Sequence, residues 1–344
     1  LQSKTYRMSC DSLKYNAQSQ VAYFISPTHL ISDKDSSEIF TNSGWYDTQS
    51  ERSLLHGDVK LFNKTQFFEA DSVYYDKERA FGRAWNHVKI RDTVQNYVLQ
   101  GNYVEHHENG GISYATDSAL LVLIDDDNDS LFLHSDTIKM YTNEKSDIQW
   151  MSAYNKVKFY REDLQGACDS LMYIVEDSII TMYYNPVMWT NEYQMTADTI
   201  RFSILDSINK RLDLCKAGFI VGGLYGNTEF NQIKGVNITG HIHDKSLYRV
   251  DIVNNAECIY YIQEEDSTLI GINTSITNEM TIFLEDNKIS QIRFYDQPDG
   301  KIHPDKQFET KDRRLVNFRW LDKYRPYNIS DLFVRPISRI KDEE

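Results

Sequence analysis

The chain has 344 residues, a formal net charge of −14 and 41% hydrophobic residues. The negative charge excludes nucleic acid as a partner class, because a phosphate backbone needs a basic protein face. No run of 18 apolar residues occurs, which excludes a membrane-spanning helix. With only 15 Gly and 6 Pro, the composition is that of a folded domain or a repeat array.

One short pattern recurs from the N-terminus onward. It consists of a small residue, Asp, Ser or Thr, and an apolar residue, usually with another apolar or aromatic residue two positions later. Its copies are Cys10–Leu13, Ala70–Val73, Thr116–Ala119, Ser135–Ile138, Cys168–Leu171 and Ala197–Ile200. Such repetition predicts a repeat architecture. Because Cys10 and Cys168 occupy the small-residue position, we expect them to be small buried residues and not disulfide partners or metal ligands.

A second anchor alternates with the first and puts Gly or Asn two positions before an apolar residue. Its copies are Gly57–Val59, Asn86–Val88, Gly101–Tyr103, Asn155–Val157 and Asn185–Val187. Gly and Asn tolerate positive φ, and Asp followed by Ser or Thr can hydrogen-bond nearby backbone amides, so both anchors suit corners. Positions 57 and 86 are 29 residues apart, and 155 and 185 are 30 apart. This spacing predicts stacked units of about 30 residues, each an up-and-back pair of strands sharing one apolar interior.

The segments between the anchors are strand-like and are bounded by turn clusters. Val59–Leu61, Val88–Ile90, Val157–Phe159 and Ile282–Leu284 are typical strand segments, and Asn109–Gly111, Asp125–Asp129 and Gln297–Gly300 are turn clusters. No amphipathic helix longer than two turns is apparent. The sequence therefore predicts an all-β chain.

The domain organisation follows the repeats. Residues 1–240 form the repeated stack, and residues 241–296 continue it as a strand-rich region. Residues 297–344 lack the Asp anchor and are more highly charged, so they are predicted to be a C-terminal cap or tail, with Arg314–Asp322 as the capping segment. The chain begins with Leu1, which predicts a processed product from which an export signal has been removed.

The alternating anchors resemble the OstA/LptA family of lipopolysaccharide-transport proteins. The closing pattern, Phe318-Arg319-Trp320 followed by Arg325-Pro326 and Asp331, is similar to the long OstA-like variants of that family. The resemblance implies an elongated, open-ended, V-shaped antiparallel β-jellyroll. It also implies a non-enzymatic periplasmic protein of outer-membrane biogenesis, or one associated with that membrane, that carries or bridges lipopolysaccharide toward it.

The same resemblance implies a ligand and partners. Lipopolysaccharide or a related lipid would place its acyl chains in an apolar groove between two sheets. Other jellyroll proteins of the bridge, or further copies of the chain, would add head to tail at unpaired strand edges. Alternation along the strands places the apolar anchor residues in such a groove or in a closed core. The candidates are Leu13, Tyr15, Val73, Tyr75, Ile138, Met140, Leu171, Tyr173, Ile200 and Phe202.

No catalytic, cofactor or metal site is expected. His241 and His243 share one face of a strand, but no Cys or third His lies nearby in the sequence. Asp125–Asp129 lacks the Gly and the Glu of an EF-hand, and Gly218–Gly226 lacks the Lys of a phosphate loop. Two alternatives remain open at this point: an extracytoplasmic parallel β-helix enzyme acting on polysaccharide, and a structural adhesin module.

Overall fold

The computed structural model describes residues 6–32, 36–124, 129–145, 147–190, 193–244, 246–264, 268–285 and 288–334. The chain forms two compact units, Leu1–Val157 and Lys158–Glu344. The boundary falls inside the region 1–240 that the sequence treats as one stack. Strands dominate both units, and each described pairing is antiparallel, which confirms the all-β, antiparallel fold class. Antiparallel pairing also rules out the parallel β-helix that the sequence left open.

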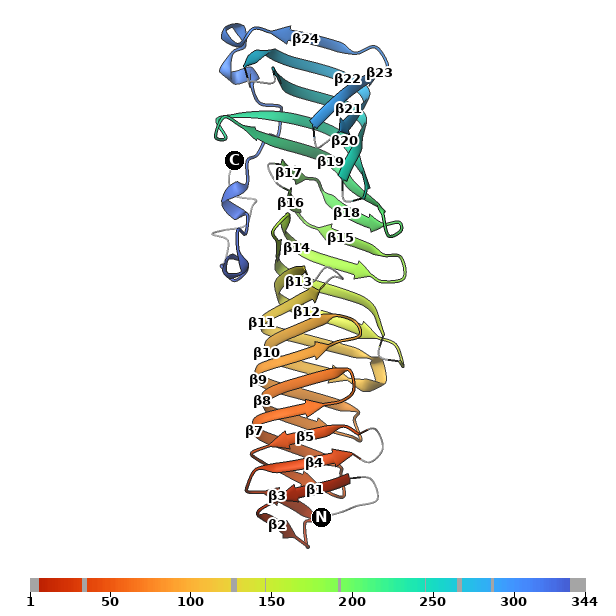
Figure 1. Ribbon diagram of the computed structural model, residues 1–344, viewed down its shortest axis with the longest axis vertical. Helices are drawn as coiled ribbons and strands as arrows, with labels where there is room; N and C mark the ends of the chain where they lie inside the picture. The colour runs from red at the N-terminus through yellow and green to blue at the C-terminus, as the bar shows by residue number, and fades with distance from the viewer. Residues whose placement is uncertain are drawn as a thin grey trace. The chain divides into compact units, whose positions relative to one another are not determined.

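Unit 1 is a stack of short and then longer strands (Figure 1). Its strands are β1 Tyr6–Cys10, β2 Leu13–Asn16, β3 Val21–Phe24, β4 Thr28–Ser32, β5 Glu38–Thr41, β6 Ser43–Asp47, β7 Arg52–Phe62, β8 Gln66–Asp76, β9 Phe81–Asp92, β10 Tyr97–His107, β11 Ile112–Ile124, β12 Ser130–Thr142 and β13 Ile148–Arg161. Strand β13 contains the boundary between the units, and one 3-10 turn, η1 Glu108–Gly110, precedes β11.

Unit 2 continues with strands and ends in a segment of short 3-10 turns. Its strands are β14 Leu164–Ile174, β15 Ile179–Tyr183, β16 Val187–Thr190, β17 Tyr193–Thr196, β18 Thr199–Ile204, β19 Asn209–Leu224, β20 Glu229–His243, β21 Ser246–Gln263, β22 Leu269–Glu285, β23 Lys288–Tyr295 and β24 Asp299–His303. The turns are η2 Asp305–Gln307, η3 Thr310–Asp312, η4 Asp322–Tyr324 and η5 Ile329–Leu332. No described helix is long and apolar enough to span a bilayer.

Pairs of left-handed residues turn the chain at regular intervals. Each pair consists of two consecutive residues with φ between 50° and 76°. The pairs are Gly57-Asp58, Asn86-His87, Asp117-Ser118 and Asn155-Lys156 in unit 1, and Tyr184-Asn185, Lys216-Ala217, Asn254-Asn255 and Asp296-Gln297 in unit 2. On β7 the two residues of the pair lie opposite a single residue of β8, because His56 pairs with Ser72 and Val59 pairs with Ala70. This is the arrangement of a β-bulge, which bends the strand and increases its twist.

The two sequence anchors therefore mark two kinds of corner. Gly57, Asn86 and Asn155 take left-handed positions, as their residue types predict. On β10 and β11 the two anchor types exchange conformations. Asp117 of the Asp anchor lies in a left-handed pair, whereas Gly101 of the Gly/Asn anchor has no positive φ and pairs with Val88 of β9. Sequence pattern alone does not separate these positions, because Gly, Asn and Asp all tolerate a corner.

The side chains of Asp71 and Asp136 contact side chains of a neighbouring strand, although the sequence predicts that they bind nearby backbone amides. The Asp71 carboxylate lies 3.0 Å from Nδ1 of His87, and the Asp136 carboxylate accepts a hydrogen bond from Nζ of Lys156 at 2.8 Å. Both partners belong to the left-handed pair of a following strand. The backbone connects other corners: the N–H of Asp198 donates to the Lys216 carbonyl oxygen at 2.9 Å. The corners are thus linked from strand to strand.

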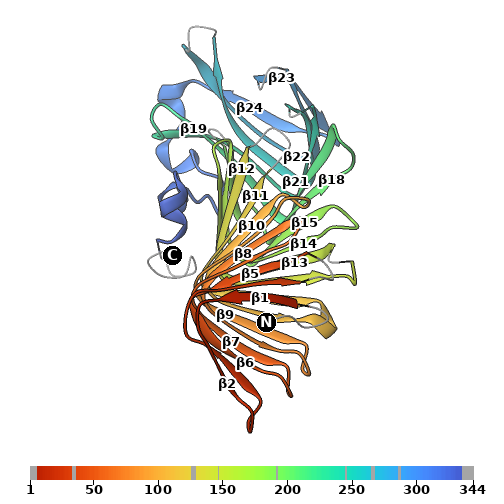
Figure 2. The ribbon, with the colours of Figure 1, turned by 60° about the horizontal axis from the view of Figure 1, so that its bottom comes forward.

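Left-handed pairs lie within every second long strand, namely β7, β9, β11, β13, β19 and β21. The strand pairings on the two sides of these corners divide each unit into two arms of sheet. In unit 1, arm A contains β2, β3, β6 and the adjoining halves of β7 to β13, and arm B contains β1, β4, β5 and the opposite halves. The strands of this unit converge along one edge and fan out from it (Figure 2). In unit 2, β15, β18 and β23 belong to arm A, and β16, β17 and β24 belong to arm B. Within each unit, the two arms agree with the antiparallel β-jellyroll that the family resemblance implies.

Candidate functional site

The inner faces of the two arms meet in unit 1. Phe24 and Leu55 on arm A pack in one cluster with Val59, and half-buried Met8 and Ile39 of arm B pack against it. Side chains alternate between faces along a strand, so inward residues of neighbouring strands form rows across the sheet. These rows are the candidate functional site.

The predicted groove residues of unit 1 lie in two adjacent rows of arm A. Leu13, Val73 and Ile138 belong to the row next to the corner, and Tyr15, Tyr75 and Met140 to the row beyond it. Ile138 and Met140 are buried, whereas Leu13, Val73 and Tyr75 are half-buried and Tyr15 is 54% exposed. The six side chains therefore lie on one surface of arm A, but they differ in solvent exposure.

Arm B carries a row that the sequence analysis missed. Its nine members lie directly opposite one another on nine neighbouring strands: Met8, Leu30, Ile39, Leu61, Phe68, Ile90, Leu99, Leu121 and Leu133. We call this set the apolar row. The last three members are buried and the other six are half-buried. The sequence contained a signal for this row, because Leu61 and Ile90 each follow the apolar residue of the second anchor by two positions.

The outer row of arm A is more polar than the apolar row. Besides Tyr15, Tyr75 and Met140 it contains Ala22, Tyr46, Ser53, Gly82, His106 and Ser113. Nδ1 of His106 lies 2.9 Å from the Ser113 hydroxyl. Burial lowers the pKa of His106 below its usual value, since desolvation disfavours the imidazolium. The interior of unit 1 thus carries hydroxyls and an imidazole on one wall and hydrocarbon on the other.

The predicted residues of unit 2 lie in its arm A. Leu171 and Ile200 belong to a row that also contains Met182, Leu214, Ile238, Ile252 and Met280, with each member at most 8% exposed. Tyr173 and Phe202 belong to the next row and are half-buried. The first of these rows is a filled core.

The other constellations form no common site in the described residues. His241 Nε2 lies 2.9 Å from Asp251, and His243 Nδ1 lies 2.9 Å from Asn209, so each imidazole has its own partner. No group of three or more potential metal ligands occurs in the described ranges. Residues 125–128 of the acidic turn lie outside them. The four cysteines are free thiols: Cys168 and Cys258 are buried, and Cys10 and Cys215 are half-buried.

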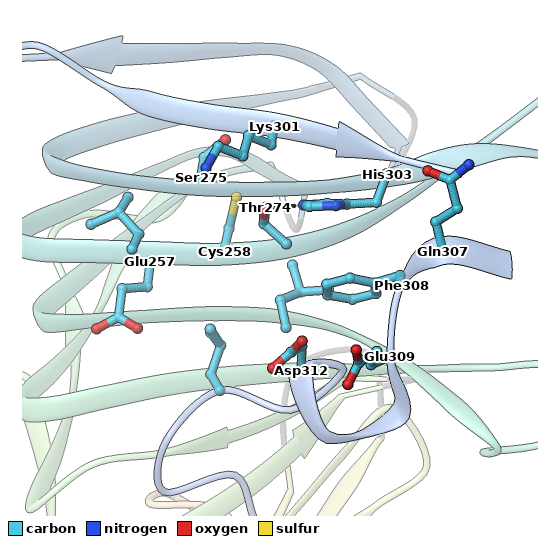
Figure 3. A pocket seen from close by; sticks show the side chains of 13 residues that line it. Glu257, Cys258, Thr274, Ser275, Lys301, His303, Gln307, Phe308, Glu309 and Asp312 are labelled. Carbon is cyan, nitrogen blue, oxygen red and sulfur yellow. Dashed lines mark hydrogen bonds between the residues drawn. The ribbon is translucent and has the colours of Figure 1, made fainter. Parts of the chain in front are cut away.

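A separate pocket of about 390 Å³ with both charged and apolar side chains lies in unit 2, between β21, β22, β24 and the turns that follow β24 (Figure 3). Lys301 and His303 lie on one side, and Glu309 and Asp312 lie on the other. His303 Nε2 lies 3.0 Å from the Thr274 hydroxyl. This pocket contains charged groups on two sides and lies in unit 2, so it is distinct from the rows of unit 1.

Comparisons with known proteins find one family model and solved structures similar to parts of the chain. Residues 127–207 match the family model described as "LptA/(LptD N-terminal domain) LPS transport protein". A solved structure of LptH, described as the LptA homologous periplasmic component of the lipopolysaccharide transport device of Pseudomonas aeruginosa, also matches. It is 17% identical, with 35% of this chain and 82% of that chain covered and a TM-score of 0.30. No curated protein matches.

The matched segment includes three copies of the Asp anchor, at Asp136, Asp169 and Asp198. These are corner positions on β12, on β14 and before β18, so the family match falls on the repeat that builds the fold. Over this segment the chain is similar to the LptA/LptD N-terminal family of lipopolysaccharide-transport proteins, and the predicted OstA/LptA resemblance is confirmed.

Proposed function

We propose that this chain is a non-enzymatic periplasmic protein of lipopolysaccharide transport that holds acyl chains between the arms of unit 1. The observation that carries this proposal is the apolar row. Its nine residues face the same interior on nine strands spaced about 4.8 Å apart, so the row extends for roughly 40 Å. The row from Met8 to Ile90 is only half-buried, which leaves hydrocarbon surface that a lipid can cover.

The energetics favour lipid over water at this surface. Burial of each methylene of an acyl chain is worth about 0.8 kcal/mol, so one chain of ordinary length can contribute several kcal/mol. The tyrosine and serine hydroxyls and His106 on the opposite wall give arm A a wetter surface. We therefore expect the acyl chains to lie against arm B, with Tyr75 and its neighbours toward the polar part of the lipid.

Partners of this function are lipopolysaccharide or a related lipid and other jellyroll proteins, or further copies of this chain. Among the described strands, β1 pairs with β4 alone and β2 with β3 alone. At the C-terminal side of unit 2, β23 and β24 each pair with β22 alone. A strand at the end of a sheet can pair with a further strand, which supports assembly by strand addition.

Adjacent residues of the same type provide a matched test of the lipid site. Phe68 belongs to the apolar row, and Phe67 lies on the opposite face of the same strand; both are half-buried. Benzoylphenylalanine is placed at each position of the full chain, and the purified variants are irradiated with lipopolysaccharide. We expect lipopolysaccharide adducts at position 68, few at position 67, and no competition by delipidated polysaccharide. Tyr75 and Tyr74 form a second pair of this kind.

Three outcomes would count against the proposal. Equal adducts at positions 67 and 68 would mean non-specific surface contact. No adduct at either position of a folded variant would mean that the interior is a sealed core, which favours the structural adhesin alternative. Competition by delipidated polysaccharide would mean that sugar, and not the acyl chain, is the bound group.

A further inference from the structure

The C-terminal segment of unit 2, residues 304–334, lies along the outer face of arm B, and we call it the strap (Figure 1). It includes Arg314–Asp322, which the sequence predicts as a terminal cap. Leu321 packs in a buried cluster with Ala167, Val187 and Trp189. Phe318 and Trp320 pack against Phe219, Val221 and Phe230, and Phe308 against Ile259, Tyr261 and Ile272. The strap therefore covers the outer face of arm B, in contact with β14, β16, β17, β19, β20, β21 and β22.

Two buried glutamines bind the main chain of the strap in the same way. Gln232 Nε2 donates to the Arg313 carbonyl oxygen at 2.8 Å, and Gln232 Oε1 accepts from the Leu315 N–H at 2.8 Å. Gln194 Nε2 donates to the Arg319 carbonyl oxygen at 2.8 Å, and its Oε1 accepts from the Leu321 N–H at 2.6 Å. Gln232 and Gln194 are 0% and 1% exposed. Each amide thus satisfies both of its polar ends on one tripeptide.

The repeat of the strap matches the repeat of the sheet. The two bound tripeptides, Arg313–Leu315 and Arg319–Leu321, both have the form Arg-x-Leu and begin six residues apart. The glutamines belong to one row of directly opposed residues: Gln165, Trp189, Gln194, Val221, Gln232 and Ile259. A glutamine therefore occurs on every second strand of this row. The strap crosses two strands for every six of its residues, so its Arg-x-Leu tripeptides match the spacing of the glutamines.

The third glutamine holds the strap through a side chain. Gln165 Oε1 accepts from Nε of Arg325 at 2.8 Å, and Arg325 lies six residues after Arg319. Farther along, Nζ of Lys158 donates to the carbonyl oxygens of Asp331 and Val334 at 3.1 and 2.8 Å. The six-residue period thus extends over three glutamines.

A charged cluster fixes the other end of the strap. Glu229 accepts hydrogen bonds from Arg313 Nη1 at 2.9 Å, Arg314 Nη1 at 3.3 Å and the Tyr261 hydroxyl at 2.5 Å. Burial alone would raise the pKa of Glu229, but these hydrogen bonds and the arginine charges bring it below its usual value. The Arg314 guanidinium also stacks over Phe230, 4.7 Å from the ring centroid.

The equivalent row of unit 1 cannot bind a peptide by this means. It lies one residue beyond the apolar row and contains Glu38, Phe62, Phe67, Arg91, Val98, Val122 and Phe132. None of these residues has an amide side chain that could donate to a carbonyl oxygen and accept from an N–H at once. The recognition therefore depends on the glutamines and is not a general property of an outer sheet face.

We propose that the outer face of arm B in unit 2 is a peptide-binding site that recognises Arg-x-Leu tripeptides at a six-residue period, with the strap as its resident ligand. The glutamines set the register through the main chain, and the leucines fill the apolar positions between strands. Because these contacts do not depend on a covalent link to β24, the strap binds the same face when its connection to β24 is cut.

The test uses the full chain with a protease site inserted between His303 and Pro304. After folding and cleavage, the nicked protein is mixed with a fluorescent peptide of residues 304–334, and exchange is followed by anisotropy. We expect saturable binding, with the dissociation constant raised roughly tenfold by Gln194→Leu or Gln232→Leu, since each substitution removes two hydrogen bonds and leaves main-chain groups unpaired. Gln263→Leu is the control, because Gln263 donates to the Tyr225 hydroxyl and not to the strap.

Circular dichroism and thermal unfolding of the uncut variants establish that they are folded. Loss of the cut segment without rebinding of the peptide would overturn the proposal. So would equal affinity of the peptide for the wild type and both glutamine variants, because the glutamines would then not set the register. A peptide with the two leucines exchanged for serine should bind far more weakly than the natural one.

Discussion

The left-handed corner at Asn86-His87 predicts an unusual sign for a glycine substitution. His87 has φ of 50°, and its side chain is 83% exposed. Left-handed backbone costs a residue with a Cβ roughly 1–2 kcal/mol, and glycine avoids this cost. Glycine also raises the entropy of the unfolded chain, which costs about 0.4–1 kcal/mol. The exposed pair with Asp71 is worth little.

His87→Gly should therefore stabilise unit 1 by about 0.5–1 kcal/mol, the difference between these terms. Lys89, two residues along the same strand, is the control, because it is not among the positive-φ residues and is paired with Glu69. Lys89→Gly should destabilise by roughly 0.5–1 kcal/mol, as glycine does within an ordinary strand. His87→Val should destabilise more than either, since a β-branched residue fits the left-handed region poorly.

Urea unfolding of the full chain measures these effects as changes of the midpoint at constant slope. In thermal unfolding the shift should be about 2–4 °C for each kcal/mol, given the size of the unit. If His87→Gly destabilises as much as Lys89→Gly, the corner is not left-handed and the explanation of the bent strands is wrong.

Three further predictions concern unit 2. Glu229→Gln should make the protection of the strap from proteolysis less dependent on pH. Folding lowers the pKa of Glu229, so its ionised carboxylate stabilises the folded chain above the unfolded pKa of about 4.3. This stabilisation is lost as the pH falls through the lower folded pKa. Cys258, whose pKa burial raises to about 11, should react with iodoacetamide at pH 8 far more slowly than half-buried Cys215, as mass spectrometry of the native protein would measure; equal rates would contradict the buried placement. Ile252→Ala should cost about 2–5 kcal/mol in urea unfolding, and Ile276→Ala, at a 60% exposed position, less than about 0.5 kcal/mol.

The repeated anchors carry much of the fold because they are local signals. Gly57 and Asn86 are residue types that tolerate positive φ, and the alternation after them, as in Val59 and Leu61, predicts an inward face without any tertiary contact. The repeat thus predicts corners, up-and-back pairs of strands and the family resemblance, whereas the structure places these corners within continuous strands. The candidate groove residues Val73 and Ile138 could be assigned to one face for the same reason.

Tertiary structure decided what a local pattern cannot encode. The exchange of roles between Gly101 and Asp117 depends on which strand carries the bulge, and this is a matter of register between strands. Whether an inward side chain is covered also depends on distant residues, so Ile138 is buried and Tyr15 exposed although both follow the same anchor.

The strap shows the same division most clearly. Its composition indicates only a charged tail, because the signal that binds it is divided between Gln194 and Gln232 in the strands and Leu315 and Leu321 more than 80 residues later. Glutamine in a strand is ordinarily a solvent-exposed residue, and it becomes a buried ligand of the main chain only when another segment covers it. The sequence by itself determined the repeat and its inward faces, whereas the location of the strap required the folded chain, since hydrogen bonds between distant segments leave no local period.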